Sequence, residues 1–287
     1  MASEGAHSQR WQRLGILAGG GDLPLELAQA CQDSAPFVVT LNGHADRDYT
    51  AFDHQDMSIG QIGGIAKVLK AAGCDTVCFA GYVQRPDIKS LKLDTRGLIM
   101  VPKALAAGRK GDDALIRVVV KEFESQGFAV VGADEVLSAL APTLNGGVDA
   151  PHDGPHRDDI AKACEIARKM GALDIGQGAV VADGLVLAVE AQEGTNAMLD
   201  RLVSLRAEIR GTPEQRCGVL AKMPKPMQER RVDLPTIGLD TVERCATAGL
   251  AGIALEAGSA LILEREAVER ALRAHNMFLV IVEADDA

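Results

Sequence analysis

The sequence predicts an α/β protein with a parallel-sheet N-terminal domain and a distinct α/β C-terminal domain. Short β-rich apolar runs alternate with helical patterns from residue 14 to residue 140, which predicts parallel strands covered by helices on both faces. A second alternation begins at residue 160. Between them, residues 141–159 hold three prolines and three glycines, a composition typical of a linker. We therefore expect domains at 1–140 and 160–287, with 1–12 as a polar leader.

In the N-terminal domain each element follows from its local pattern. An apolar run at 14–18 ends in Gly19-Gly20-Gly21-Asp22, and Pro24 suits the first turn of the helix that follows. The other expected elements are strands at 36–41, 76–80 and 128–131 and helices at 59–72, 112–126 and 133–140. Asp112 or Asp113 is the expected cap of the helix at 112–126, in preference to a binding site.

In the C-terminal domain the strongest local signal is the Asp183-Gly184 pair between two apolar runs of residues 179–190, which predicts a hairpin. The other expected elements are helices at 160–170, 197–207 and 266–274 and strands at 218–221, 261–263 and 278–282. Thr195 or Asn196 is placed to cap the helix at 197–207. An equal alternative is that the segment 190–197 aims a hydroxyl and a carboxylate at a ligand.

The composition indicates a globular protein that does not bind nucleic acid. The 287 residues include 30 Lys and Arg against 40 Asp and Glu, a formal charge of −10, and 47% of them are hydrophobic. This apolar content suffices for full cores and excludes general disorder. Only 3% of the residues are aromatic, and an acidic chain with few stacking platforms is poorly suited to nucleic acid.

The cysteines and the N-terminus indicate the cytoplasm. The six cysteines are scattered, and residues 1–13 lack the apolar core of a signal peptide. Cys74 and Cys78 are too widely spaced for a Cys-x-x-Cys motif and have no second pair to complete a zinc site. Scattered thiols are typical of a reducing compartment.

The first candidate site is the turn formed by Gly19, Gly20, Gly21 and Asp22. Glycines let a phosphate or ribose approach the backbone at a helix N-terminus, where N–H groups and the helix dipole favour anions. The pattern is neither a Gly-x-Gly-x-x-Gly fingerprint nor a P-loop. A plain tight turn is the alternative interpretation.

The second candidate site is the loop at 222–238. It contains three prolines, which exclude a continuous helix. Four cations fall within ten residues of this otherwise acidic chain: Lys222, Lys225, Arg230 and Arg231. They could neutralise a diphosphate, and Asp233 beside them is expected to stay ionised and to hold a divalent cation or accept a proton from water. The alternative is a solvated basic loop with a structural Arg–Asp pair. The histidine- and aspartate-rich run at 152–159 is broken by Pro155 and favours a solvated linker over a metal site.

Six blocks occur in one order along the chain: LGILAGGGDLP from Leu14, GYVQRP from Gly81, KGDD from Lys110, DIGQ from Asp174, EGTNAM from Glu193 and KPMQERRVDLPTIG from Lys225. Together they resemble the UDP-2,3-diacylglucosamine pyrophosphatase family of lipid A biosynthesis, the type unrelated to the calcineurin-like phosphoesterases. The resemblance runs from about residue 14 to residue 282, and the DLPTIG block is its most specific part.

The resemblance implies hydrolysis of the pyrophosphate bond of UDP-2,3-diacylglucosamine to UMP and 2,3-diacylglucosamine 1-phosphate (lipid X). Water would attack the α-phosphorus with the help of a divalent metal, Mg²⁺ or alternatively Mn²⁺. The resemblance further implies a Rossmann-like N-terminal domain, a substrate enclosed between the domains and a homodimer. The expected partner is thus a lipid nucleotide-sugar. The expected location is the cytoplasm, with at most transient contact with the surface of the inner membrane.

The resemblance also implies roles for individual residues. Asp233 is the expected metal ligand or water activator, with Glu229 as a second metal ligand. Lys225, Gln228 and Arg230 match the loop expected to hold the diphosphate and complete the catalytic set. The expected substrate-binding residues are Gly19, Gly20, Gly21, Asp22, Thr195, Asn196, Lys222, Arg231 and Thr236. Asn196 and Glu229 stand where the family pattern has Asp.

Two other functions remain open. One is a non-catalytic nucleotide-sugar-binding regulatory module, in which Asp233 is purely structural. The other is an NAD-dependent oxidoreductase that binds its dinucleotide through the turn at Gly19. Turnover distinguishes the first from a hydrolase, and NAD binding tests the second.

Overall fold

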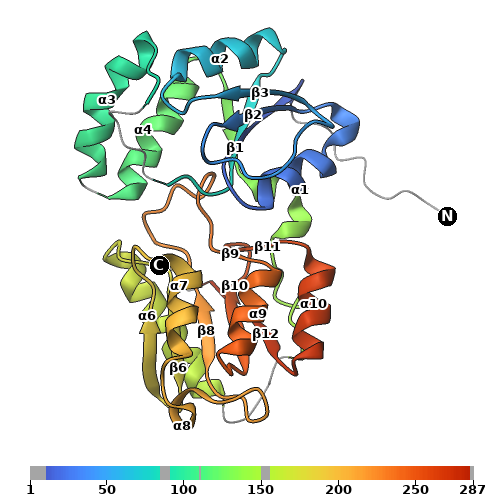
Figure 1. Ribbon diagram of the computed structural model, residues 1–287, viewed down its shortest axis with the longest axis vertical. Coiled ribbons are helices and arrows are strands. Elements are labelled where there is room, and N and C mark those ends of the chain that lie inside the picture. The colour runs from blue at the N-terminus through green and yellow to red at the C-terminus, as the bar shows by residue number, and fades with distance from the viewer. Residues whose placement is uncertain (1–10, 85–90, 110, 150–155, 285–287) are drawn as a thin grey trace, which may run out of the picture. The chain divides into compact units, whose positions relative to one another are not determined.

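Two five-stranded sheets organise the chain, and helices flank them (Figure 1). The computed structural model describes residues 11–84, 91–109, 111–149 and 156–284. The chain divides into two compact units, Met1–Ser138 and Ala139–Ala287. The mixed α/β class predicted from the sequence is confirmed. Some residues named above lie outside the described ranges: residues 1–10, Arg85, Pro86, Lys110, His152, Asp153 and Pro155.

The sheet of the first unit is parallel throughout, in the order β3-β2-β1-β4-β5. Its strands are β1 (Leu14–Ala18), β2 (Phe37–Leu41), β3 (Asp53–Met57), β4 (Thr76–Ala80) and β5 (Ala129–Val131). The chain begins in the middle, moves out to β3 and crosses back to β4, which is the Rossmann-like order. The ends of β1 and β4 therefore flank the point where the strand order reverses, the usual ligand position in open α/β sheets.

Apolar faces attach the helices of the first unit to its sheet. Its helices are α1 (Leu23–Ala30), α2 (Ile62–Ala71), α3 (Thr95–Gly108), α4 (Asp112–Ser125) and α5 (Ala133–Val136), with short 3-10 helices at Gln32–Ser34 and Ser138–Leu140. Along α2, Ile62, Ile65 and Leu69 are buried at helical spacing. A Cβ added to Gly15 of β1 would lie 2.5 Å from the Leu69 side chain, so glycine allows this close packing.

The second unit has a mixed sheet in the order β12-β10-β8-β6-β7. Its strands are β6 (Gly178–Ala182), β7 (Leu185–Val189), β8 (Val219–Lys222), β10 (Gly252–Glu256) and β12 (Phe278–Val282), and β9 (Thr236–Ile237) pairs separately with β11 (Leu261–Ile262). Strands β8, β10 and β12 are parallel, whereas β6 is antiparallel to β8 and β7. The predicted hairpin is confirmed, with Asp183 and Gly184 at φ 47° and 73°, as a type I′ turn requires.

Helices cover both faces of the second sheet. They are α6 (Arg157–Ala172), α7 (Gly194–Leu202), α8 (Ala207–Arg210), α9 (Leu239–Thr247) and α10 (Arg265–Ala274). Alternate strand residues pack in two separate clusters, as the two-residue period of a strand requires. Ala163 and Ala167 of α6 pack with Val219 of β8, whereas Leu220 packs with buried residues of α7, α9 and α10.

Two helix starts differ from the sequence prediction. The N-cap of α4 is Gly111, so Asp112 and Asp113 lie in the first turn instead of capping it, where carboxylates interact favourably with the helix dipole. The N-cap of α7 is Glu193, so the caps predicted at Thr195 and Asn196 are wrong. In both cases a glycine at positive φ, Gly111 or Gly194, lets the helix begin earlier.

Several elements carry too weak a local signal to be predicted. Strand β3 has four exposed residues out of five, because it is an edge strand held by parallel pairing with β2. Helices α3 and α9 and strand β10 were not expected as elements. Helix α6 begins at Arg157, inside the segment predicted as a linker, and the helix expected at 133–140 divides into α5 and a 3-10 turn.

We predict that Asp159 of α6 is a main support of the β6–β7 hairpin. Its buried carboxylate accepts hydrogen bonds from the backbone N–H groups of Asp183 (2.9 Å) and Gly184 (2.7 Å). Replacing Asp159 by Ala leaves both donors without this acceptor and should lower the free energy of unfolding by about 2 to 3 kcal/mol in urea titrations. Asp158→Ala, at the exposed neighbouring position, should cost about 0.5 kcal/mol or less. Equal effects of the two changes would contradict this role.

Candidate active site

Lys222 ends β8 with its side chain buried in the second unit. The side chain is 5% exposed, and its Nζ donates a hydrogen bond to the carbonyl oxygen of Thr236 at 2.9 Å. Burial lowers the pKa of Lys222, and the carboxylates of Glu190 and Asp233 oppose that shift. A buried ammonium requires such partners, so the three side chains form one electrostatic unit, which we call the Lys222 cluster.

Asp233 lies in the loop between β8 and β9, where its backbone N–H donates to the carbonyl oxygen of Glu229 at 3.1 Å. Its side chain forms a hydrogen bond with Gln228. Burial raises the pKa of Asp233 and outweighs Gln228, Lys225 and Lys222, which lower it. The sequence indicated only the cations, which favour the ionised form, and not the burial that favours the protonated form.

Gln228 and Lys225 fold the loop back onto the segment before β6. The amide oxygen of Gln228, a buried residue, accepts the backbone N–H of Lys225 at 3.0 Å, and its Nε2 lies 3.4 Å from Oε1 of Gln177. Lys225 Nζ pairs with Oδ1 of Asp174 at 2.8 Å. The structure thus brings Lys222, Lys225, Gln228 and Asp233 together, as predicted for the loop, and joins them to the DIGQ block.

Glu190 begins the segment 190–197, for which the sequence left open a hydroxyl and a carboxylate aimed at a ligand, although Glu190 itself was not among the predicted site residues. It follows β7, its side chain is 7% exposed, and its Oε1 accepts the Thr195 hydroxyl at 2.8 Å. Its Oε2 is buried with no hydrogen-bond partner among the described residues. The available signal was an acidic residue that ends an apolar strand just before the start of a helix at Gly194.

Gly178 of β6 lies between Glu190 and Lys222 in the sheet and leaves space for the Glu190 side chain. Gly178 pairs with Lys222 on one side, and its carbonyl oxygen accepts the N–H of Glu190 at 2.8 Å on the other. A Cβ on Gly178 would lie 2.6 Å from Oε2 of Glu190, and one on Gly176 would lie 2.1 Å from its carbonyl oxygen. Both glycines therefore provide space that any larger residue would fill.

Three other residues predicted in the loop bind groups of the protein itself. Arg230 donates to the carbonyl oxygen of Gly258 at 3.2 Å and to the Ser259 hydroxyl. Arg231 binds both carboxylate oxygens of Glu229, at 2.8 and 3.0 Å. The structural pair of this loop is therefore Arg231–Glu229 and not the Arg–Asp pair that the sequence left open. Thr236 takes part through its backbone, because its carbonyl oxygen holds Lys222.

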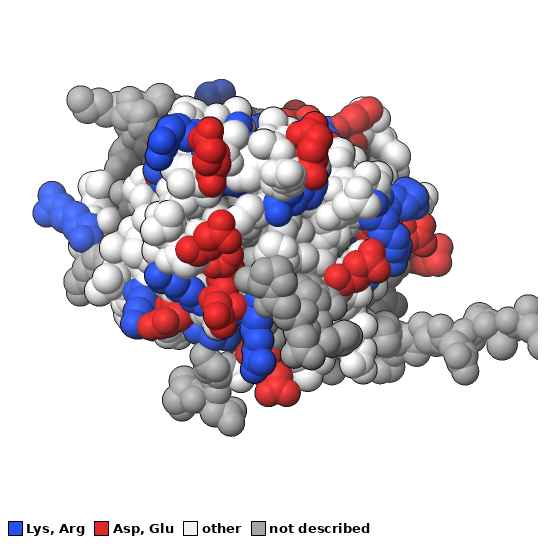
Figure 2. Space-filling model, turned by 90° about the horizontal axis from the view of Figure 1, so that it is seen from below, with Lys and Arg blue, Asp and Glu red and all other residues white. Residues whose placement is uncertain are grey.

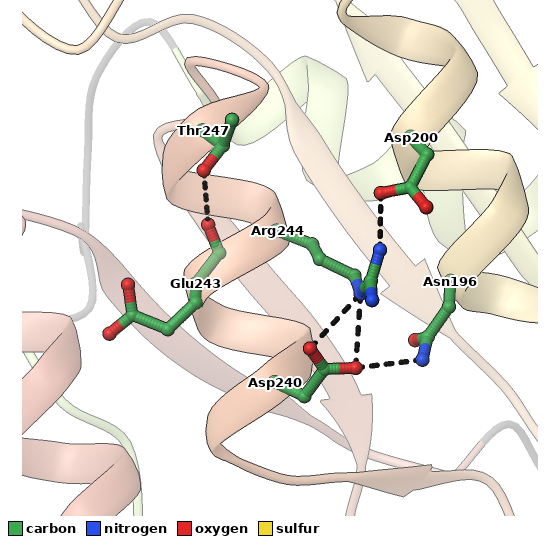
Figure 3. A network of polar contacts seen from close by, with 6 residues as sticks. All are labelled: Asn196, Asp200, Asp240, Glu243, Arg244 and Thr247. Carbon is green, nitrogen blue, oxygen red and sulfur yellow. Dashed lines mark hydrogen bonds and ion pairs between the residues drawn. The ribbon is translucent and has the colours of Figure 1, made fainter.

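Asn196 belongs to a separate polar network that links α7 to α9 (Figure 3). Its side-chain amide donates to Oδ2 of Asp240 at 2.7 Å. Arg244 binds the same carboxylate at 3.0 Å and also pairs with Asp200. The neighbouring Thr195 contacts Glu190 instead. Adjacent positions that were predicted to bind substrate thus contact two different sets of partners.

The side chains at this site restrict how a metal ion could be bound. Within the described residues, no three or more His, Cys, Asp or Glu side chains are grouped as metal ligands. Both oxygens of Glu229, the predicted partner of Asp233 in metal binding, are bound by Arg231. Mg²⁺ is usually bound by one or two carboxylates together with substrate phosphates. Asp233 and the unpartnered Oε2 of Glu190 fit that kind of site.

The glycine turn of the first unit uses its amides internally. The N–H groups of Gly19, Gly20 and Gly21 donate to Ala80 O (2.8 Å), Tyr82 O (2.9 Å) and Oδ1 of Asp46 (2.9 Å). The Tyr82 ring covers Gly20, where a Cβ would lie 2.4 Å from Cζ. These glycines were predicted to let a phosphate or dinucleotide approach the N-terminus of the helix that follows. The turn is instead held together by β4 and Asp46.

Asp22, also predicted to bind substrate, pairs with Arg47 through Oδ1 at 2.6 Å. The hydroxyl of Tyr82 donates to Oδ2 of Asp46 at 3.1 Å, and the Tyr82 side chain is 57% exposed. A ligand at this end of the first sheet would therefore meet an aromatic ring and these charged side chains.

Comparison with known families covers both units. The model of the LpxI N-terminal domain matches residues 13–140, and that of the LpxI C-terminal domain matches residues 148–280. The chain belongs to the LpxI family. An LpxI relative, the UDP-2,3-diacylglucosamine pyrophosphatase LpxI of Caulobacter vibrioides, is 51% identical over 278 residues, which are 96% of this chain and 99% of that one.

Similarity to solved structures adds nothing on activity. CobK precorrin-6A reductase is similar over 96% of this LpxI-family chain and 89% of its own, with 12% identity and a TM-score of 0.35. A likeness of this degree carries no information on the reaction.

We predict that Asp233 lowers the stability of this LpxI-family chain near neutral pH. A carboxyl whose pKa is raised on folding contributes stability that is fully present below its unfolded pKa of about 3.9. That contribution is lost as the pH rises through the folded pKa. Asp233→Asn, which does not titrate, should therefore gain stability relative to the wild type between pH 4 and neutral pH. Urea unfolding across this range measures the difference, with Asp158→Asn as an exposed control. A difference for Asp233→Asn that is independent of pH would contradict the prediction.

Proposed function

We propose that this chain hydrolyses the pyrophosphate bond of UDP-2,3-diacylglucosamine and releases UMP and 2,3-diacylglucosamine 1-phosphate. The observation that carries the proposal is the Lys222 cluster, in which the buried Lys222 and Glu190 interact with each other and with Asp233, the first residue of the DLPTIG block. The likeness to the Caulobacter pyrophosphatase along 96% of the chain supports the same activity. The turn at Gly19 lends no support to the alternative of a dinucleotide-dependent oxidoreductase, because the amides of Gly19, Gly20 and Gly21 donate to protein acceptors.

Lys222 and Lys225 provide the positive charge that the diphosphate requires. Stabilisation of phosphoryl-transfer transition states is largely electrostatic, and fixed charges are most effective where water is excluded. Lys222 is held by Thr236, and Lys225 is held by Asp174, so neither ammonium must be reoriented during the reaction. Their positions are set before substrate binds, which is the main advantage of such a site.

Asp233 is the proposed acceptor of the proton from the attacking water. A general base is most effective when its pKa is close to the working pH, and burial moves the pKa of Asp233 upward from its ordinary acidic value. Gln228 is hydrogen-bonded to Asp233 and holds the backbone of Lys225. Gln228 therefore acts as a positioning residue for both the base and the loop.

We assign the metal to Asp233 together with the diphosphate oxygens of the substrate, with Glu190 nearby. Mg²⁺ is the proposed ion, with Mn²⁺ as an alternative, and when bound it would neutralise charge on the diphosphate. Thr195 fixes one oxygen of Glu190 and leaves Oε2 available. The family resemblance further suggests a homodimer in the cytoplasm with transient contact at the inner membrane surface.

Replacing Asp233 by Ala should reduce Mg²⁺-dependent release of UMP by about 100-fold or more, because it removes the proposed base. UMP release is measured by chromatography, and substrate binding is measured in parallel. Asp158→Ala, an exposed carboxylate on α6, should keep wild-type turnover. Full activity of Asp233→Ala would refute the assignment. A wild type that binds the substrate without turnover would instead favour the regulatory nucleotide-sugar-binding module.

The two candidate second carboxylates give different metal responses. Glu190→Gln keeps an acceptor for Thr195 but removes a charge, so it should raise the Mg²⁺ concentration for half-maximal activity by about tenfold. Glu229→Gln loses a pair with Arg231 and should change that concentration much less. Titration of activity with Mg²⁺ compares the two variants. A larger effect at Glu229 would restore the ligand set expected from the sequence.

A further inference from the structure

Helix α3 presents an apolar stripe on its exposed side. Of its 14 residues, only Gly97 and Met100 are buried. Leu98 and Ile99 are each 60% exposed and Leu105 is 47% exposed. With Pro102 and Ala106, which are also exposed, they recur at the spacing of one helical face. Large aliphatic side chains clustered in this way usually mark an interaction surface.

A groove with a basic lining lies beside this stripe. It occupies about 380 Å³ between α3 and α4. Its apolar lining residues are small: Ala106, Ala107, Ala114 and Val118. Three exposed cations complete the lining: Lys103, Arg117 and Lys121. Arg117 pairs with Asp113 at 2.9 Å. Lys103 and Lys121 have no ion-pair partner among the described residues.

The charge around α3 is opposite to that of the whole chain. Residues 91–125, which include α3 and α4, contain seven basic and five acidic residues in a protein of net charge −10. Arg96 of α3 pairs with Glu122 of α4 at 2.6 Å. Asp94 is occupied as the N-cap of α3, where it accepts the N–H of Gly97 at 2.8 Å. Figure 2 shows a face on which acidic and basic side chains are interspersed. The segment that contains α3 and α4 is thus net basic in a chain that is acidic overall.

We propose that α3 and the α3–α4 groove dock this chain on an anionic phospholipid membrane. A helix with aliphatic residues on one face and lysines or arginines beside them lies at the membrane interface, where its apolar side chains enter the acyl boundary and its cations meet the phosphates. A second copy of the chain is a less suitable partner for this surface than a membrane. A two-fold interface would place the same basic patch on both subunits and bring like charges together.

The docking surface deepens the proposed function, because a substrate with two acyl chains is supplied from a membrane. The attachment would be peripheral, since among the described residues no helix has the length and apolar character needed to cross a bilayer. Docking itself requires no turnover. Its test can therefore fail or succeed independently of the hydrolytic activity.

Sedimentation with vesicles tests the proposal. The full-length wild type should bind vesicles of phosphatidylglycerol and phosphatidylcholine, bind pure phosphatidylcholine weakly, and lose binding as salt is raised. Lys103→Glu combined with Lys121→Glu should lower partition to anionic vesicles by at least about tenfold. Leu98→Ser combined with Ile99→Ser should also lower it, because the apolar contact is lost.

Matched controls change the same residue types elsewhere. Lys67→Glu on α2 and Leu185→Ser with Val186→Ser on β7 alter exposed positions and should keep vesicle binding. Release of UMP from detergent-dispersed substrate should be unchanged in the α3 variants, which separates docking from catalysis.

Three results would overturn the proposal. The first is a wild type that does not bind anionic vesicles or binds neutral ones equally well. The second is α3 variants that bind as the wild type does. The third is that Leu98→Ser with Ile99→Ser dissociates a dimer in light scattering, which would make this face a contact between two copies of the chain.

Discussion

The burial of Lys222 beside two carboxylates is the constraint around which the second unit is arranged. An ammonium removed from water is costly unless charged and hydrogen-bonded partners compensate it. The residues of β8 before Lys222 are apolar and buried. Lys222 is buried because it is the last residue of this interior strand. Asp233, Glu190 and the carbonyl oxygen of Thr236 supply the compensation. Removing Glu190 leaves the buried ammonium with fewer partners, whereas Asp233 adds a carboxyl whose own burial favours its protonated form.

Several otherwise unrelated features follow from that constraint. Gly178 lies between Lys222 and Glu190 in the sheet, and Gly176 gives the backbone of Glu190 its space. The loop after β8 turns back toward the DIGQ block through Lys225 and Asp174, which brings Asp233 to the cluster. These residues are far apart in the sequence, and the charged site requires all of them. Such sites commonly retain groups that reduce stability, because activity requires them.

In the described part of the first unit, the glycine turn has no comparable cluster of buried charges. The turn lies at the reversal point of a Rossmann-like sheet, where ligands usually bind. Its three amides nevertheless donate to β4, Tyr82 and Asp46, and the exposed ring of Tyr82 covers Gly20. The fold thus indicates where a ligand would bind, whereas the side chains determine which ligand could bind there. This unit also carries the exposed apolar side chains of α3 and the groove between α3 and α4.

The sequence alone determined the α/β alternation, the Asp183-Gly184 hairpin and the family, because each rests on local patterns or on blocks of adjacent residues. It also located the loop that bears Lys225, Gln228 and Asp233. Only the tertiary structure decided which distant side chains meet. Glu190 reaches Lys222 across Gly178, Asn196 binds Asp240, and Glu229 is occupied by Arg231. The physical reason is that burial and pairing depend on sheet register and loop path, which link residues far apart in the chain and leave no mark in a local pattern.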